Sequence, residues 1–141
     1  MHGARVEMDM ERMRTLPILS DLDESLLREL APHFATENFP EGRDIIHEGD
    51  PGNRFYILVR GSVAVRKGST PLAVLQDGDY FGEIALLKNS PRTATVEAIR
   101  PSLCVSLSRQ TFFAILNKYP EVQRQLTEVA QARFAKLGGT W

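Results

Sequence analysis

Glycines recur through the middle of the chain at intervals that leave room only for short secondary-structure elements. The runs between them are rich in β-branched and aromatic residues, as in FYILVRGSVAVRKG around Gly61. Because glycine favours turns and such runs favour strands, the spacing predicts a β-sandwich, barrel or jelly roll over residues 36–107. The turn-forming glycines are Gly42, Gly49, Gly52, Gly61, Gly68, Gly78 and Gly82.

Helical patterns flank this β-rich segment. In SDLDESLLRELAPHF the leucines repeat at helical spacing. Several residues at its start, Asp23 among them, can cap a helix, and Pro32 is expected to end it. After the strands, Ser108 can cap a helix and Pro120 suits the first turn of the next one. We therefore predict helical segments at 1–35 and 108–141.

Composition narrows the classes of function. The chain has 141 residues, of which 43% are hydrophobic and 25% charged, which suits one globular domain. A formal net charge of −1 disfavours a nucleic-acid partner. The single cysteine, Cys104, excludes an internal disulfide, and the three histidines have no metal-ligand spacing. No run is long enough to span a membrane and no signal peptide is visible, so we expect a cytoplasmic protein, or the soluble part of a larger and even membrane-attached one.

The stretch FGEIALLKNSPRTATVEA, at 81–98, contains the parts of an anion site. Gly82 lacks a Cβ, so a ligand can approach its backbone closely. The residues that follow favour a one-turn helix at about 83–87, which Asn-Ser-Pro then ends. The first N–H groups of such a helix have no intrahelical partner, and Arg92 adds a permanent cation that can bind two phosphate oxygens. These parts predict a site for one phosphate.

Glu83 would repel a phosphate unless it faces another part of the ligand. An ionised carboxylate only accepts hydrogen bonds, so it needs a donor such as a sugar hydroxyl. A ligand with a phosphate at one edge and a ribose 2′-OH at the other satisfies both Glu83 and Arg92. A 3′,5′-cyclic nucleotide has this shape.

The same stretch resembles the phosphate-binding cassette of cyclic nucleotide-binding domains. These domains occur in regulatory subunits of cAMP-dependent protein kinase, in cGMP-dependent kinase, in cyclic-nucleotide-gated channels and in the bacterial catabolite activator protein. The nine-residue step from Glu83 to Arg92 matches the kinase-type cassette without a gap. Outside the cassette, FPEGRDIIHEGDPGNRFYILVRGSVAV is similar to the family's first hairpins, and 108–137 to its two C-terminal helices. The residues that match the cassette pattern are Phe81, Gly82, Glu83, Ile84, Ala85, Arg92, Thr93 and Ala94.

The resemblance implies a role for each cassette residue. Glu83 would accept a hydrogen bond from the ribose 2′-OH, Arg92 would hold the exocyclic phosphate oxygens, and Gly82 would lie close to the ribose. The backbone N–H groups that would complete the phosphate cradle are those of Ile84, Ala85 and Ala94.

The resemblance also implies a fold and a moving part. The family fold is mainly β with flanking helices: an eight-stranded jelly roll with the cassette inserted, here at 81–96, and a C-terminal helix that closes over the base as a lid. Phe134 and Leu137 are candidate lid residues, with packing against the core as the alternative for both. Trp141 is either a third lid candidate or part of a frayed end. In the family, a hydroxyl directly after the cassette arginine can bond the 2-amino group of guanine, and Thr93 stands there.

These implications predict a regulatory domain that is not an enzyme and needs no metal or cofactor. It would bind cAMP in preference to cGMP and transmit occupancy through its C-terminal helix to an effector domain or partner. The first alternative is an interaction or dimerisation module of the same fold that binds no nucleotide; loss of Glu83 or Arg92 would mark such a module, and both are present. Without a ligand, Glu83 could instead cap the short helix and Arg92 could pair with it as a surface ion pair.

Two further alternatives belong to other classes. A DNA-binding transcription factor would need a helix-turn-helix after the last helix, and the sequence ends a few residues past it. Hydrolysis of a cyclic phosphate would need a positioned base or a metal, which the cassette does not supply. Cys104 has no histidine nearby in the sequence to activate it as a nucleophile.

Overall fold

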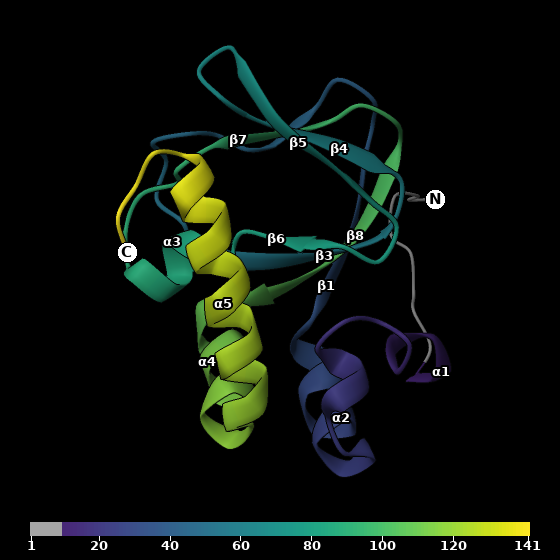
Figure 1. Ribbon diagram of the computed structural model, residues 1–141. Helices are drawn as coiled ribbons and strands as arrows, with labels where there is room; N and C mark the ends of the chain where they lie inside the picture. Colours follow the sequence, from purple (N-terminus) through teal and green to yellow (C-terminus); the bar gives the residue numbers. More distant parts are fainter. Residues whose placement is uncertain (1–9) are drawn as a thin grey trace.

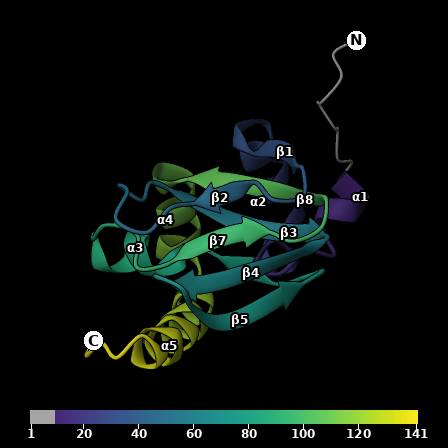
Figure 2. The same cartoon turned by 90° about the horizontal axis from the view of Figure 1, so that it is seen from above.

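Eight strands form two four-stranded antiparallel sheets in the computed structural model, which describes residues 10–141 (Figures 1 and 2). Sheet A has the order β1 (Ala35–Phe39), β8 (Ser102–Ser108), β3 (Arg54–Arg60) and β6 (Tyr80–Phe81). Sheet B has the order β2 (Asp44–Ile46), β7 (Thr95–Ala98), β4 (Ser62–Lys67) and β5 (Thr70–Gln76). The predicted mainly-β fold of eight strands with flanking helices is confirmed.

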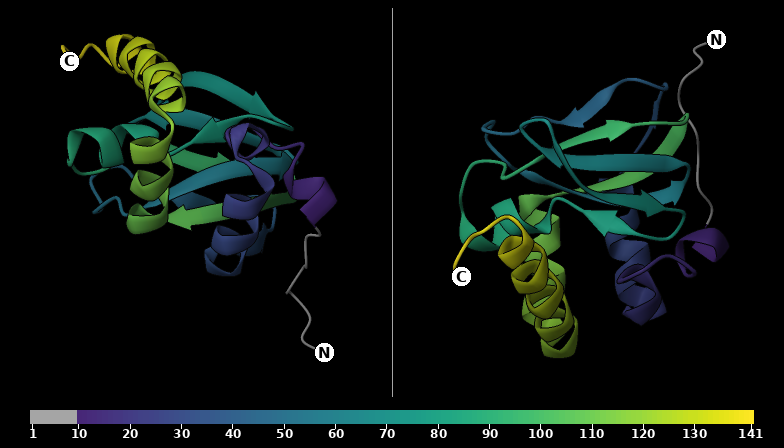
Figure 3. Two further views of the ribbon diagram at one scale, coloured as in Figure 1. Left: turned by 90° about the horizontal axis from the view of Figure 1, so that it is seen from below. Right: turned by 45° about the horizontal axis from the view of Figure 1, so that its top comes forward.

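The helices at 10–33 and 109–126 pack on the side of sheet A that faces away from sheet B, and the end of the last helix extends towards sheet B (Figure 3). Residues 1–9 of the predicted N-terminal helical segment lie outside the described part. Within 10–141, no helix is both long and apolar enough to cross a membrane. The helices are α1 (Met10–Met13), α2 (Glu24–Leu30), α3 (Glu83–Lys88), α4 (Arg109–Lys118) and α5 (Pro120–Lys136), with 3₁₀ turns at Leu19–Asp21 and Ala31–His33.

Strand β8 is central in sheet A and is buried on both faces. Val105 and Leu107 point to the helical side, where they join a cluster around Phe55 and Phe112. Cys104 points between the sheets, and burial raises the pKa of its thiol to about 12. A thiol with such a pKa carries almost no thiolate near neutral pH, so Cys104 is a core residue and not a nucleophile.

Local capping places the helices as the sequence predicts. The side chain of Asp23 accepts a hydrogen bond from the Leu26 N–H, and that of Ser108 accepts one from the Thr111 N–H. Helix α5 begins with Pro120 at its first position and ends before Gly138, whose φ is +83°.

The junction of α4 and α5 is bonded to the N-terminal helices. The hydroxyl of Tyr119 donates to the Asp23 carboxylate and accepts from the Asp23 N–H, both at 2.9 Å. Because Asp23 also caps α2, these bonds join the start of α2 to the residue between α4 and α5. The point from which α5 extends is thereby fixed to the rest of the fold.

The helical cluster gives a first prediction. Phe112 is 1% exposed and its ring centroid lies 4.9 Å from that of Phe55, whereas the neighbouring Phe113 is only half-buried. Phe112→Ala should lower the free energy of unfolding by about 3–5 kcal/mol, because it leaves a cavity between α4 and sheet A. Phe113→Ala, on the same helix, should lower it clearly less. Urea unfolding of both variants measures the difference, and equal losses would contradict this account of the core.

Candidate functional site

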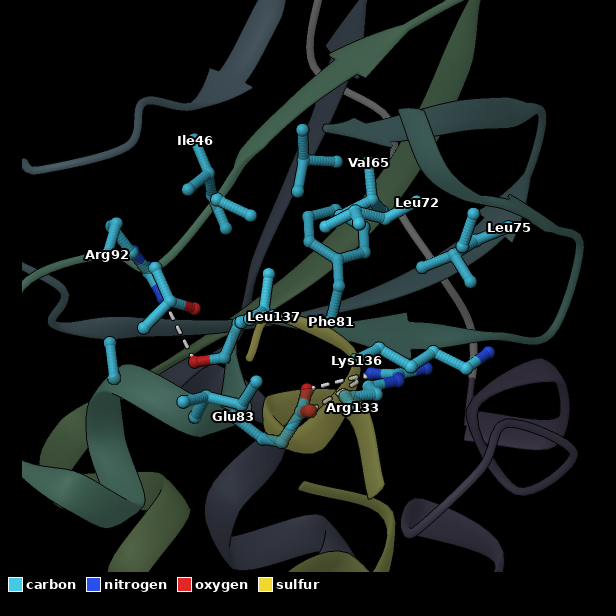
Figure 4. A pocket seen from close by; sticks show the side chains of 17 residues that line it. Ile46, Val65, Leu72, Leu75, Phe81, Glu83, Arg92, Arg133, Lys136 and Leu137 are labelled. Atoms are coloured by element: carbon cyan, nitrogen blue, oxygen red, sulfur yellow. Dashed lines mark hydrogen bonds and ion pairs between the residues drawn. The ribbon is translucent and has the colours of Figure 1, made fainter. Parts of the chain in front are cut away.

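A cavity of about 210 Å³ lies between sheet B, helix α3 and the last turns of α5 (Figure 4). All the predicted contact residues of the cassette line this cavity, and they come from two stretches of chain, 82–85 and 92–94. Of the candidate lid residues Phe134 and Leu137, only Leu137 lines it. The cassette residues that line the cavity are Gly82, Glu83, Ile84, Ala85, Arg92, Thr93 and Ala94.

Left-handed backbone at both ends determines the length of helix α3. Gly82 precedes the helix with φ of +94°, a conformation that favours glycine, and Asn89 follows it with φ of +50°. The N–H of Asn89 bonds back to carbonyls of the last turn, and the Ser90 N–H donates to the Ala85 carbonyl at 3.0 Å. The predicted short helix is confirmed, one residue longer than expected.

Two backbone carbonyls hold the Arg92 side chain in place. Its Nη1 donates to the Gly82 carbonyl at 2.9 Å and its Nη2 to the Arg54 carbonyl at 2.7 Å. Arg92 is only 8% exposed, and this burial lowers the pKa of its guanidinium. The arginine is therefore a partly desolvated cation with a defined direction, which strengthens its attraction for an anion.

The loop at 49–52 fixes the Arg92 backbone. The Arg92 N–H donates to the Asp50 carbonyl, and the Arg92 carbonyl accepts from the Gly49 N–H, both at 2.8 Å. A Cβ on Gly52 would lie 2.5 Å from the Ala85 Cβ and 3.0 Å from the Arg92 Nε. Only glycine leaves room there, so this loop can pack directly against both halves of the cassette.

Glu83 is paired with an arginine from α5 that the sequence analysis did not identify. Its side chain is 1% exposed, and its two oxygens accept from the Arg133 Nη1 at 2.9 and 3.1 Å. The same nitrogen donates to the Tyr80 carbonyl at 2.9 Å. Burial raises the pKa of Glu83, and the charge of Arg133 opposes that rise. The alternative in which Glu83 pairs with Arg92 is wrong, because each has other partners.

The rest of the cavity wall is apolar. It is formed mainly by sheet B and Phe81, and α5 adds Lys136 and Leu137 at its rim (Figure 4). Arg92 and Glu83 are thus at one side of the cavity and aliphatic side chains at the other. The arrangement suits a ligand with an anionic group, a hydroxyl donor and a flat, weakly polar ring. The aliphatic wall includes Ile46, Val65, Leu72, Leu75 and Val96.

Nothing in the described residues indicates a metal site. Within 10–141, no three His, Cys, Asp or Glu side chains cluster closely enough to hold an ion. The charged groups of the cavity are one carboxylate and three cations, from Glu83, Arg92, Arg133 and Lys136.

Fold and cavity together define a β-roll with a short inserted helix and a buried arginine in the wall of its cavity. The sequence profile of the cyclic nucleotide-binding domain matches residues 36–119, which include both sheets up to the end of α4 and the whole cassette. The chain belongs to the family of cyclic nucleotide-binding domains.

The chain is similar in sequence and structure to known proteins of this family. The chain is 37% identical over 126 residues to a cAMP-dependent protein kinase regulatory subunit of Dictyostelium discoideum, a match that covers 84% of this chain and 38% of that protein. It is 33% identical over 129 residues to cGMP-dependent protein kinase isozyme 1 of Drosophila melanogaster, covering 86% and 17%. The solved structure of cAMP-bound PfPKA-R superposes with a TM-score of 0.79 at 31% identity, over 92% of this chain and 46% of that one. The chain spans less than half the length of each.

Burial of Glu83 gives a prediction about pH. Because its pKa in the folded protein is raised above the ordinary value of 4.5, ionising Glu83 reduces stability as pH rises through that range. Glu83→Gln has no charge to bury, so its stability relative to the wild type should increase between about pH 4 and pH 7. Urea unfolding at several pH values measures this difference, with the exposed Glu41→Gln as the control. A difference that moves the other way would mean that the ion pair with Arg133 outweighs the burial.

Proposed function

We propose that this chain is a regulatory domain that binds a 3′,5′-cyclic mononucleotide in the cavity, cAMP in preference to cGMP. The observation that carries the proposal is the placement of Arg92 and Glu83. Each lines the same cavity and each is held by its own partners, so neither neutralises the other. A cation and a carboxylate kept apart in this way match a ligand that has a phosphate and a hydroxyl at separate positions.

The phosphate would bind Arg92 and the start of α3. An arginine has five N–H donors, and the two carbonyl bonds of Arg92 use only two of them. The guanidinium can therefore remain fixed while it donates to phosphate oxygens. The N–H groups of Ile84 and Ala85, in the first turn of α3, and of Ala94 add donors on the same side.

The ribose 2′-OH would donate to Glu83. Burial makes a carboxylate expensive to leave without hydrogen bonds, and Arg133 supplies bonds from one side only. A hydroxyl from the ligand gives this buried carboxylate a further donor. Gly82 precedes Glu83 and leaves room for the sugar, because it has no side chain.

Helix α5 would report occupancy. It contributes Arg133, Lys136 and Leu137 to the cavity wall, so the ligand contacts α5 as well as the cassette. A ligand that binds more tightly when α5 is closed shifts the helix towards that position. The effector is a further domain or another protein, and the free, unreactive thiol of Cys104 suits a cytoplasmic setting. The domain binds and signals, and it performs no chemistry.

The first test removes the phosphate contact. Arg92→Ala should weaken cAMP binding tenfold to over a hundredfold, since a lost charge-assisted hydrogen bond is worth about 1.5–3 kcal/mol. Calorimetry measures this on protein stripped of bound nucleotide, and Arg60→Ala, an exposed arginine on β3, is the matched control. Unchanged affinity in Arg92→Ala, or no binding of cAMP or cGMP to the wild type, would overturn the proposal in favour of a module that binds no nucleotide.

The second test concerns the base. Thr93 lines the cavity, and one relative is a cGMP-dependent kinase, so cGMP is the competing ligand. A single neutral hydrogen bond is worth about 0.5–1.5 kcal/mol, which limits its effect on selectivity to about tenfold. Thr93→Ala should weaken cGMP more than cAMP, and Thr93→Ser, which keeps the hydroxyl, should not. Equal losses for the two nucleotides in Thr93→Ala would exclude Thr93 as a reader of the base.

A further inference from the structure

The cassette helix and the lid helix meet a second time, outside the cavity. The ammonium of Lys88, the last residue of α3, lies 4.8 Å from the ring centroid of Phe134 and 4.7 Å from that of Trp141. The two rings are edge-to-face, with centroids 6.0 Å apart and planes at 85°. One cation therefore contacts two aromatic rings, and we call these three residues the Lys88 cage.

The chain after α5 folds back to complete the cage. The N–H of Gly139 donates to the Phe134 carbonyl at 3.1 Å, and Gly138 has φ of +83°. A Cβ on Gly139 would lie 2.3 Å from the Phe134 ring, so the backbone of Gly139 packs directly against that ring. This turn brings the end of the chain back beside α3 (Figure 1). There the Lys88 ammonium also makes a long, weak bond of 3.5 Å to the Trp141 carbonyl.

We propose that Lys88 is a positioning residue that fastens α5 against the cassette, with Phe134 and Trp141 as its receptor. None of the three lines the cavity, so the cage acts on a ligand only through the position of α5. Phe134 directly follows Arg133 and precedes Lys136 and Leu137, the cavity residues of α5. A cage that holds Phe134 in place therefore also holds the part of the lid that closes the cavity.

Helix α3 is thus joined to α5 at both of its ends. Glu83 at its start binds Arg133 inside the cavity, and Lys88 at its end binds Phe134 and Trp141 outside it. A ligand hydroxyl adds a donor to Glu83 at the first contact and leaves the second untouched. The consequence for nucleotide binding rests on the proposed function: loosening the cage should speed dissociation and leave association nearly unchanged.

Trp141 is the only tryptophan in the sequence, so intrinsic fluorescence reports on the cage alone. In the nucleotide-free 141-residue chain, Lys88→Gln should make Trp141 more accessible to acrylamide and should speed amide hydrogen exchange over 130–137. Lys88→Arg retains a cation that can contact both rings and should restore both readouts. The matched control is Lys118→Gln, which removes the same charge from an exposed position at the end of α4.

The second arm measures the dissociation rate of a fluorescent cAMP analogue by stopped flow. Lys88→Gln should raise this rate about two- to fivefold, as expected for the loss of an exposed cation–π contact, and Lys88→Arg should not. Unchanged quenching and exchange in Lys88→Gln would overturn the positioning role. So would faster exchange and stronger quenching with an unchanged dissociation rate. If the wild type binds no cyclic nucleotide, the proposed function fails, and quenching and exchange alone then decide whether Lys88 fastens α5.

Discussion

A carboxylate buried beneath a helix requires a counter-charge, and in this chain that requirement joins two segments far apart in the sequence. The side chain of Glu83 is almost entirely buried, and Arg133 supplies its ion pair from α5, fifty residues later. Without α5 in place, Glu83 would be a buried charge with no ion-pair partner, which is strongly unfavourable. The position of α5 is therefore tied to the charge of Glu83 in the cassette. A ligand that adds a donor to Glu83 acts directly on that connection.

Arg92 and Glu83 lie in one cavity but do not form an ion pair with each other. Arg92 is oriented by carbonyl oxygens, which leave its positive charge uncompensated, and Glu83 is paired on its other side. The glycines make this possible: Gly52 lets the supporting loop contact Ala85 and Arg92, and Gly82 gives α3 its left-handed start. The site is preorganised because backbone contacts, rather than mobile side chains, determine where the cation lies.

Sequence reasoning succeeded where the determinants are local. The caps at Asp23 and Ser108 and the short helix after Gly82 all depend on near neighbours in the chain. Arg133 was missed because it looks like any charged residue beside an apolar helical stripe, and its role depends on where α5 lies over the cassette. Phe134 was expected near the base, but its ring is turned to Lys88, since Gly138 and Gly139 fold the chain back and bring Trp141 beside it. Such contacts arise only once the elements have packed.

The bond between Tyr119 and Asp23 has a mechanical consequence for the lid. It holds the near end of α5 fixed, while the 17 residues of the helix extend for about 25 Å at 1.5 Å per residue. Any rotation of α5 about Tyr119 therefore moves its far end the most. A rotation of about 10° moves that end by about 4 Å, enough to separate Leu137 from the cavity wall. Under the proposed function, such a rotation on ligand binding would displace the far end of α5 by an amount that a partner bound there could detect.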